Sequence, residues 1–290
     1  MLAGLIAADF AITGTWPMRT ELIGNLKKNM GALASSIVLV CRPRPTDAPK
    51  TTRRAFLDAL RRELPGALRD LQHGNIAPVD LAQASIGPGM AVYSRYAAVL
   101  DAEGKPVTVR QALQFINQAL DEVLAEQEGE FDEQTRWAIA WYEQYRTEAG
   151  PYGMAETLSK AKNTSVAGVV EAGFLESRAG KVRLLRRDEL PEDWDPAADR
   201  RLTVWEGAQH LVRALDRDGE TGAARLLARL GAVGGTARDL AYRLYVLCER
   251  KGWAQEALSY NALVIAWPEI TRLAAQQDTS VEQHSLFSGV

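Results

Sequence analysis

Residues 154–185 read MAETLSKAKNTSVAGVVEAGFLESRAGKVRLL, and this stretch decides the fold of the middle of the chain. We expect a short helix over residues 154–161, followed by a turn whose Ser165 caps a second helix. Two strand-length runs around Arg178-Ala-Gly180 predict a hairpin after it. Helix, turn, helix and hairpin follow one another in this order in a winged helix. The sequence therefore predicts a winged-helix-like unit over residues 151–190.

The N-terminal segment, residues 1–45, predicts a short helix followed by a strand hairpin. The runs 12–16 and 34–41 are β-branched and apolar nearly throughout, and a polar loop separates them. Two such strands cannot bury both faces of their sheet by themselves. We therefore expect an apolar face that another domain or a second chain would cover.

The remaining segments have a mostly helical pattern. Residues 46–150 predict a helical domain in which the prolines and glycines of 75–90 fix turns. Residues 188–199, with six acids and no base, predict a solvated linker. Residues 200–275 predict a helical bundle with tetratricopeptide-like helix pairs, and residues 276–290 a flexible tail. The predicted fold class is mainly α, of the α+β kind.

The composition is that of a soluble globular protein. Of the 290 residues 47% are hydrophobic and 24% are charged, which excludes a disordered or fibrous chain. No apolar run approaches the roughly 18 residues that a membrane span needs, and the first residues lack the pattern of a secretory signal. We therefore expect a cytoplasmic protein that has no membrane partner. The two cysteines and three histidines are scattered, so we expect neither a disulfide framework nor a metal site.

The charges are unevenly distributed along the chain, although the net charge is only −3. Residues 1–62 carry ten Lys/Arg against four Asp/Glu and residues 156–187 seven against three, whereas residues 101–150 carry eleven acids against four bases. Several cations on one surface can neutralise phosphates, so we expect DNA contacts from the two basic stretches. The candidate DNA-contacting residues are Lys160, Lys162, Ser165, Lys181 and Arg183, with Arg42, Arg53 and Arg54 behind them. The alternative is a solvated surface on a small packing domain. Winged helices also serve as protein-binding modules, so this fold by itself does not imply DNA binding.

Catalytic patterns are weak in this sequence. Gly87-Pro88-Gly89 lacks the spacing of a phosphate-binding loop, and Pro88 has no backbone N–H to donate, so we interpret it as a turn. The acidic run 126–133 is typical of a solvated helix end. No Gly-x-Ser-x-Gly stretch occurs, and the scattered histidines supply no base for a nucleophile. We therefore predict no catalytic residue in this chain.

Two stretches near the N-terminus carry a resemblance to a known family. Residues 12–21, ITGTWPMRTE, and 32–44, ALASSIVLVCRPR, resemble the closing segment of the methyltransferase domain of large adenine-specific DNA methyltransferases. These enzymes also carry a domain of unknown function and occur among bacterial anti-phage defence genes. Further similar stretches are 75–96, 161–165 and 240–253. The resemblance implies that residues 1–42 are the last helix and strand hairpin of a methyltransferase α/β sheet, and that the rest is a C-terminal extension that helps to hold DNA.

The motifs that define this family do not occur in the chain. It contains neither a Phe-x-Gly-x-Gly-like loop for S-adenosylmethionine nor an Asp/Asn-Pro-Pro-Tyr-like motif for the flipped adenine. The resemblance therefore implies a fragment that is inactive alone and has no cofactor site, while S-adenosylmethionine belongs to the full-length enzyme. Its partners would be DNA and the missing N-terminal methyltransferase half, or another protein of a defence complex. The alternative is a non-enzymatic interaction module that docks a helicase or ATPase of such a complex.

Overall fold

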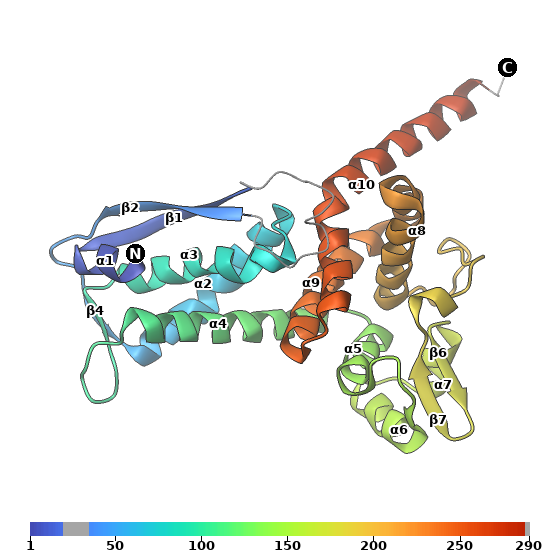
Figure 1. Cartoon of the computed structure of the whole chain (residues 1–290), viewed down its shortest axis with the longest axis horizontal. Coiled ribbons are helices and arrows are strands. Elements are labelled where there is room, and N and C mark those ends of the chain that lie inside the picture. The colour runs from blue at the N-terminus through green and yellow to red at the C-terminus, as the bar shows by residue number, and fades with distance from the viewer. Residues whose placement is uncertain (20–34, 288–290) are drawn as a thin grey trace. The chain divides into compact units, whose positions relative to one another are not determined.

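The computed structural model describes residues 1–19 and 35–287, and the chain forms two compact units, Met1–Gln127 and Glu128–Val290. It is mainly helical, with small sheets, an N-terminal hairpin and a C-terminal helical bundle (Figure 1), which confirms the predicted fold class. The predicted loop between the first two strands falls largely outside the described residues.

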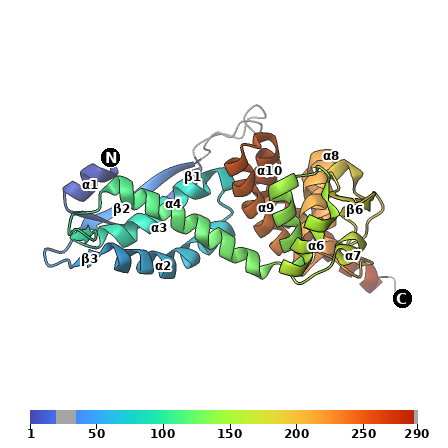
Figure 2. The same ribbon diagram turned by 90° about the horizontal axis from the view of Figure 1, so that it is seen from below.

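The first unit combines two small sheets with three long helices. Its elements are α1 (Leu2–Ala7), β1 (Phe10–Arg19), β2 (Ser35–Pro43), β3 (Lys50–Thr52), α2 (Arg53–His73), α3 (Pro78–Ser94), β4 (Ala98–Leu100) and α4 (Val109–Glu126). β1 and β2 form an antiparallel hairpin, whereas β3 and β4 pair in parallel with Thr52 opposite Leu100. Figure 2 shows α2, α3 and α4 running side by side, and their buried side chains form the core of this unit.

The hairpin packs through β1 on α3. Ser94 at the end of α3 accepts a hydrogen bond of 2.8 Å from the backbone N–H of Ile12, which is buried. Gly87 permits the close approach, because a Cβ atom there would lie 2.0 Å from Cγ2 of Thr15. On the opposite face of the hairpin the large apolar side chains are exposed, as predicted. They are Trp16, Met18, Val38 and Val40.

The helices of the first unit continue through prolines and glycines. Pro65 lies inside α2, and the turns predicted at Gly87, Pro88 and Gly89 are wrong, because α3 continues through all three residues. Packing explains the glycines of α3. A Cβ atom at Gly89 would lie 2.6 Å from Ile116 of α4, so Gly89, like Gly87, is a contact point between elements.

The second unit begins with a winged helix. Its elements are η1 (Gln127–Glu130), α5 (Glu133–Tyr145), β5 (Gly150–Pro151), α6 (Tyr152–Ala161), α7 (Val166–Glu171), β6 (Leu175–Arg178), β7 (Lys181–Leu184) and η2 (Arg187–Glu189). The strands pair antiparallel in the order β5-β7-β6, and β6 and β7 form the wing. The predicted order of helix, turn, helix and hairpin is thus present over residues 151–190, and α5, which we assigned to the helical domain 46–150, precedes it and packs on α6. Trp137 of α5 is buried and donates to the carbonyl of Ala155, which ties the two helices together.

The bundle comprises α8 (Val204–Leu230), α9 (Ala232–Lys251) and α10 (Ala254–Phe287). Gly219 interrupts α8, Gly231 separates α8 from α9, and Gly252 ends α9. All three adopt positive φ angles of 55° to 72°, which glycine adopts readily. α10 continues to Phe287 and thus extends into the segment 276–290 that we predicted as a flexible tail.

A shared cap joins the winged helix to the bundle. Asp132 accepts from the backbone N–H of Thr135 in α5 at 2.7 Å and from that of Val204 in α8 at 2.9 Å. The Thr135 hydroxyl donates to Asp132 and accepts from the N–H of Trp205. The first N–H groups of a helix have no partner within that helix. Two side chains therefore satisfy such N–H groups at the starts of both α5 and α8.

Gly87→Ala should destabilise the first unit, because the added methyl group meets Thr15 close to the strand backbone. We expect a loss of about 1–3 kcal/mol in the free energy of unfolding. Gly66→Ala in α2 is the matched control. Apart from its chain neighbours and the backbone of its own helix, no atom lies within 4 Å of the added Cβ, so this variant should stabilise the protein by about 0.5–1 kcal/mol. Urea unfolding of both variants measures the difference, and equal effects would contradict the close-packing account.

Candidate nucleic-acid interface

The last turn of α6 and the turn that follows it carry three of the predicted DNA-contacting residues. Ser165 is the N-cap of α7 and accepts from the backbone N–H of Gly168 at 3.0 Å, as expected of a cap. Lys160 is exposed and pairs with Glu156 at 3.6 Å, a surface pair that contributes little. Lys162 is partly exposed, and none of the described carboxylates lies within ion-pair distance of it.

The tip of the wing is positively charged. Ala179 and Gly180 form its two-residue turn with φ angles of 51° and 72°, as in the turns of tight hairpins. Arg178 and Lys181 flank the turn directly opposite each other, and both are exposed. Within the described part of the chain neither has a carboxylate within 4 Å. Arg178 was not among the eight predicted residues, although it lies in the same basic stretch.

Arg183 has a structural role in the wing. It contacts Glu176 on the opposite strand at 2.7 Å and Glu189 of η2 at 2.6 Å, and it is only partly exposed. The hydrogen bond to Glu189 is the main cause of the raised pKa of Arg183, and that bond also lowers the pKa of Glu189 to about 2. Two carboxylates therefore already neutralise its charge, which makes Arg183 a weaker candidate for a phosphate contact than Lys162 or Lys181.

In winged helices the helix before the wing usually enters the DNA groove. In this chain that helix is α7, and few of its side chains can bind base edges. The exposed side chains of α7 are Ala167, Val170 and Glu171, and Glu171 pairs with Arg201 at 2.7 Å. Base edges are read mainly by Arg, Lys, Asn and Gln side chains. Exposed apolar side chains, Tyr152 and Met154, occur on the neighbouring α6.

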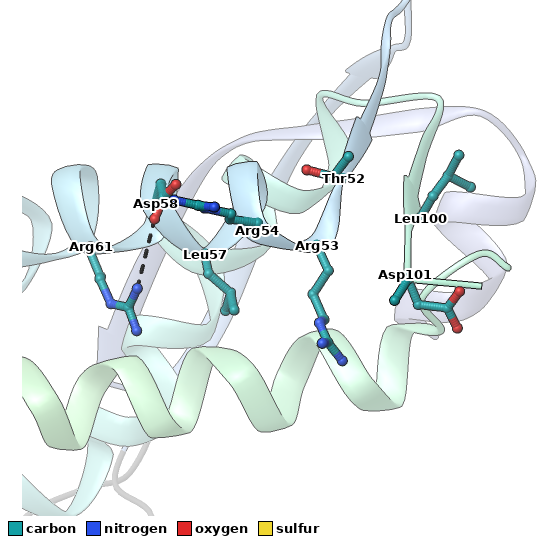
Figure 3. Close-up of a pocket in the computed structure, with 9 residues that line it drawn as sticks. Thr52, Arg53, Arg54, Leu57, Asp58, Arg61, Leu100 and Asp101 are labelled. Carbon is teal, nitrogen blue, oxygen red and sulfur yellow. Dashed lines mark ion pairs between the residues drawn. The ribbon is translucent and has the colours of Figure 1, made fainter. Parts of the chain in front are cut away.

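The three predicted residues of the first unit lie at two places. Arg42 is exposed on β2, opposite Ala11. Arg53 and Arg54 form the first turn of α2 and line an open cavity of about 550 Å³ (Figure 3). Arg61, two turns further along α2, lines the same cavity and pairs with Asp58 at 3.8 Å.

A second cavity, of about 380 Å³, lies in the second unit between the winged helix and the bundle. At its wall Arg187 donates to Gln209 at 2.9 Å and to Glu256 at 2.7 Å, and its guanidinium lies 5.0 Å from the ring centre of Tyr260. Tyr142 also donates to Glu256, at 3.2 Å. The sequence did not predict this cluster, because its members come from four distant segments and form no local motif.

The electrostatics of this second cavity indicate a structural role. Burial opposes the charge of Arg187, but Tyr260 and Glu256 outweigh it, so the pKa of Arg187 is raised. Burial raises the pKa of Tyr142 and Tyr260 and brings that of Cys248, close to Tyr142, to about 12. These groups keep one protonation state near neutral pH, which is unlike the tuned acid or base of an active site.

One buried carboxyl group titrates near neutral pH. Glu206 is the N3 residue of α8 and accepts from the Thr203 hydroxyl at 2.9 Å in a capping box. Burial raises its pKa to about 8, although the hydrogen bond from Thr203 acts in the opposite direction. Glu206 lines neither cavity, so it belongs to the cap that starts the bundle.

The residues that the structure describes offer no metal site and no membrane span. No three His, Cys, Asp or Glu side chains among them are grouped as ligands. None of the described helices is both long and apolar enough to cross a bilayer.

Glu206→Gln should remove a pH dependence of stability. The folded state holds the Glu206 proton up to about pH 8, whereas an unfolded chain releases it near pH 4.3. The wild-type free energy of unfolding should therefore fall as pH rises between these values, by on the order of 5 kcal/mol. Gln keeps the cap, so the variant should show a flatter curve and exceed the wild type at pH 8. Urea unfolding from pH 5 to 9 tests this. Glu249→Gln, at an exposed position of α9, is the control that should change nothing.

Comparison with known proteins gives one match. A family model described as a domain of unknown function (DUF8807) matches residues 132–286. Neither the curated proteins nor the solved structures gave a match. The matched segment starts at Asp132, the shared cap, and spans the winged helix and the bundle. It covers more than half of the chain, which therefore belongs to the DUF8807 family.

Proposed function

We propose that the second unit binds DNA through the phosphate backbone, with the wing and the turn before α7 as the contact surface. The observation that carries this proposal is the winged-helix topology together with Lys162, Arg178 and Lys181, which have no carboxylate partner among the described residues. Cations of this kind bind phosphates and release condensed counterions.

The distribution of charge within the winged helix supports the proposal. Residues 132–190 contain nine acids and nine bases, so the segment is neutral as a whole. Glu176 and Glu189 contact Arg183, away from the wing tip, where Arg178 and Lys181 face each other. Like charges directly opposite in a hairpin are destabilising, so folding does not explain this pair. A phosphate between them would.

We expect this binding to depend little on base sequence. The exposed residues of α7 offer two apolar side chains and an acid that is already paired, so direct base contacts are poor. Contacts to phosphates position a protein on DNA but carry no sequence information. Any choice of target sequence would then come from another protein or domain.

We also propose that the chain is the DNA-associated part of an adenine-specific DNA methyltransferase of the anti-phage defence or restriction-modification type. The similarity of residues 12–21 and 32–44 to the end of such a methyltransferase domain supports this. So does the hairpin of β1 and β2, whose outer face leaves Trp16, Met18 and Val38 exposed for a further layer of structure.

S-adenosylmethionine does not fit either of the two cavities described above. Its sulfonium group is a cation, whereas each of the two cavities is lined by three arginines. Gly87 and Gly89, the glycines nearest to a loop motif, lie inside α3. We propose that residues outside this chain carry out methyl transfer, because the two motifs that such enzymes need do not occur in its sequence.

Arg178→Ala/Lys181→Ala should weaken DNA binding, because two phosphate contacts are lost. We expect the slope of log affinity against log salt concentration to decrease by about 1 per residue, equally for unrelated DNA sequences. Arg217→Ala/Arg225→Ala on α8 is the control, since it removes the same charge from exposed positions outside the winged helix. Fluorescence anisotropy over a salt series measures both. An unchanged slope in the wing variant, or no binding by the wild type, would overturn the proposal.

A non-enzymatic protein-interaction module is the second candidate. The observation that favours it is the set of exposed apolar side chains on the winged helix, Tyr152, Met154 and Val170. Protein-binding sites often expose such side chains. Absence of DNA binding by the wild type would favour this candidate, with a helicase or ATPase of a defence complex as the partner.

The chain alone should not methylate DNA. With labelled S-adenosylmethionine and adenine-containing duplexes we expect no incorporation of methyl groups, because the cofactor loop and the adenine-gripping motif are absent from the sequence. Incorporation would contradict the proposed division of roles. A coding sequence next to this gene that contains both motifs would supply the catalytic half, and its absence would leave only the DNA-binding part of the proposal.

A further inference from the structure

The cavity of about 550 Å³ in the first unit has the chemistry of an anion site. We infer that it binds the phosphate monoester of a nucleotide or of a nucleic-acid end. This inference does not rest on the proposed function, because the cavity is formed entirely by the first unit and the wing belongs to the second.

Arginines dominate the wall of the cavity. Arg53, Leu57 and Arg61 are spaced four residues apart and project from the same side of α2, as Figure 3 shows, whereas Arg54, which also lines the cavity, extends toward Asp58. Arg61 shares its charge with Asp58 at 3.8 Å and Glu122 at 3.4 Å. Arg53 and Arg54 have no carboxylate within ion-pair distance among the described residues. Two guanidinium groups are thus available for bidentate bonds to phosphate oxygens.

The carboxylates of the cavity are already occupied. Asp58 faces Arg61, and Asp101 accepts from the backbone N–H groups of Glu103 at 3.1 Å and Lys105 at 2.8 Å. These two hydrogen bonds hold the loop after β4 in place, and their N–H dipoles partly offset the negative charge of the Asp101 carboxylate. The three arginines therefore outnumber the two acids that line the cavity, and the acids have other partners.

The place of the arginines is unfavourable for the helix itself. Arg53 and Arg54 form the first turn of α2, which contains no acid, at the end where the helix dipole is positive. The Thr52 hydroxyl accepts from the backbone N–H of Ala55 at 3.2 Å. The backbone N–H groups of Arg53 and Arg54 are therefore left for another acceptor. A bound anion would relieve the repulsion and accept from those groups.

The cavity also lies where parallel strands end. β3 and β4 pair in parallel up to Thr52 and Leu100, both of which line the cavity, and β3 continues directly into α2. Open parallel sheets bind ligands in the crevice outside the carboxyl ends of their strands. The arginine-lined cavity, the charge balance and this topology point to the same ligand class.

Titration of the full chain tests the inference with four probes: inorganic phosphate, adenosine monophosphate, and one single-stranded oligonucleotide with either a 5′-phosphate or a 5′-hydroxyl. We expect binding of the phosphate monoesters and preference for the 5′-phosphorylated oligonucleotide over the 5′-hydroxyl form. Arg53→Ala/Arg54→Ala should weaken phosphate-monoester binding about a hundredfold, at about tenfold for each charge-assisted contact. Tighter binding of adenosine monophosphate would identify a free nucleotide as the source, and tighter binding of the phosphorylated oligonucleotide a strand end.

Arg62→Ala/Arg110→Ala is the matched control. Both arginines are exposed in the same unit and lie outside the cavity, so this variant should bind like the wild type. Thermal unfolding without ligand distinguishes loss of binding from loss of folding, since Arg53→Ala/Arg54→Ala should melt no lower than the wild type. Equal loss in both double variants, or no binding of any monoester by the wild type, would overturn the inference. If the wild type binds duplex DNA normally but binds no phosphate monoester, only this inference fails and the proposed function is unaffected.

Discussion

The second unit depends on the need to satisfy the first N–H groups of two helices that start side by side. Asp132 and Thr135 accept from N–H groups at the starts of both α5 and α8. Buried donors of this kind cannot be left without partners at an acceptable cost, so the two helix starts have to remain together. The winged helix and the bundle are therefore one structural unit, which agrees with a family match that begins at Asp132 and covers both.

The same requirement for partners separates structural cations from available ones. Arg183 is held by two carboxylates, Arg187 by Glu256 and Gln209, and Arg243 by Glu128 at 2.5 Å. Each of these contacts holds two elements of the fold together. Charge counts along the sequence cannot make this distinction, because Arg183 and Lys181 lie in the same basic stretch and only the strand pairing shows which of them faces an acid.

Local signals in the sequence predicted a large part of the fold. The Ser165 cap and the wing turn depend on residues close together in the chain, and the structure has both of them. The predicted turns at Gly87 and Gly89 are wrong because Thr15 and Ile116 decide what those glycines do. The contact of Arg187 with Glu256 spans 69 residues and leaves no local pattern. Of the candidate site residues, Arg53 and Arg54 proved to share a cavity, which spacing alone could not show.

Both candidate anion sites contain cations that folding alone disfavours. At the wing tip Arg178 and Lys181 stand opposite each other, and at the start of α2 Arg53 and Arg54 face the positive end of the helix dipole. Residues that destabilise the local structure and have no compensating contact are expected mainly at functional positions, because selection for stability would replace them elsewhere. An anion would compensate both departures by the same physics. The two proposals therefore call for one kind of ligand chemistry in two units of different fold, and phosphate, as the common anion of DNA and nucleotides, would satisfy it in each.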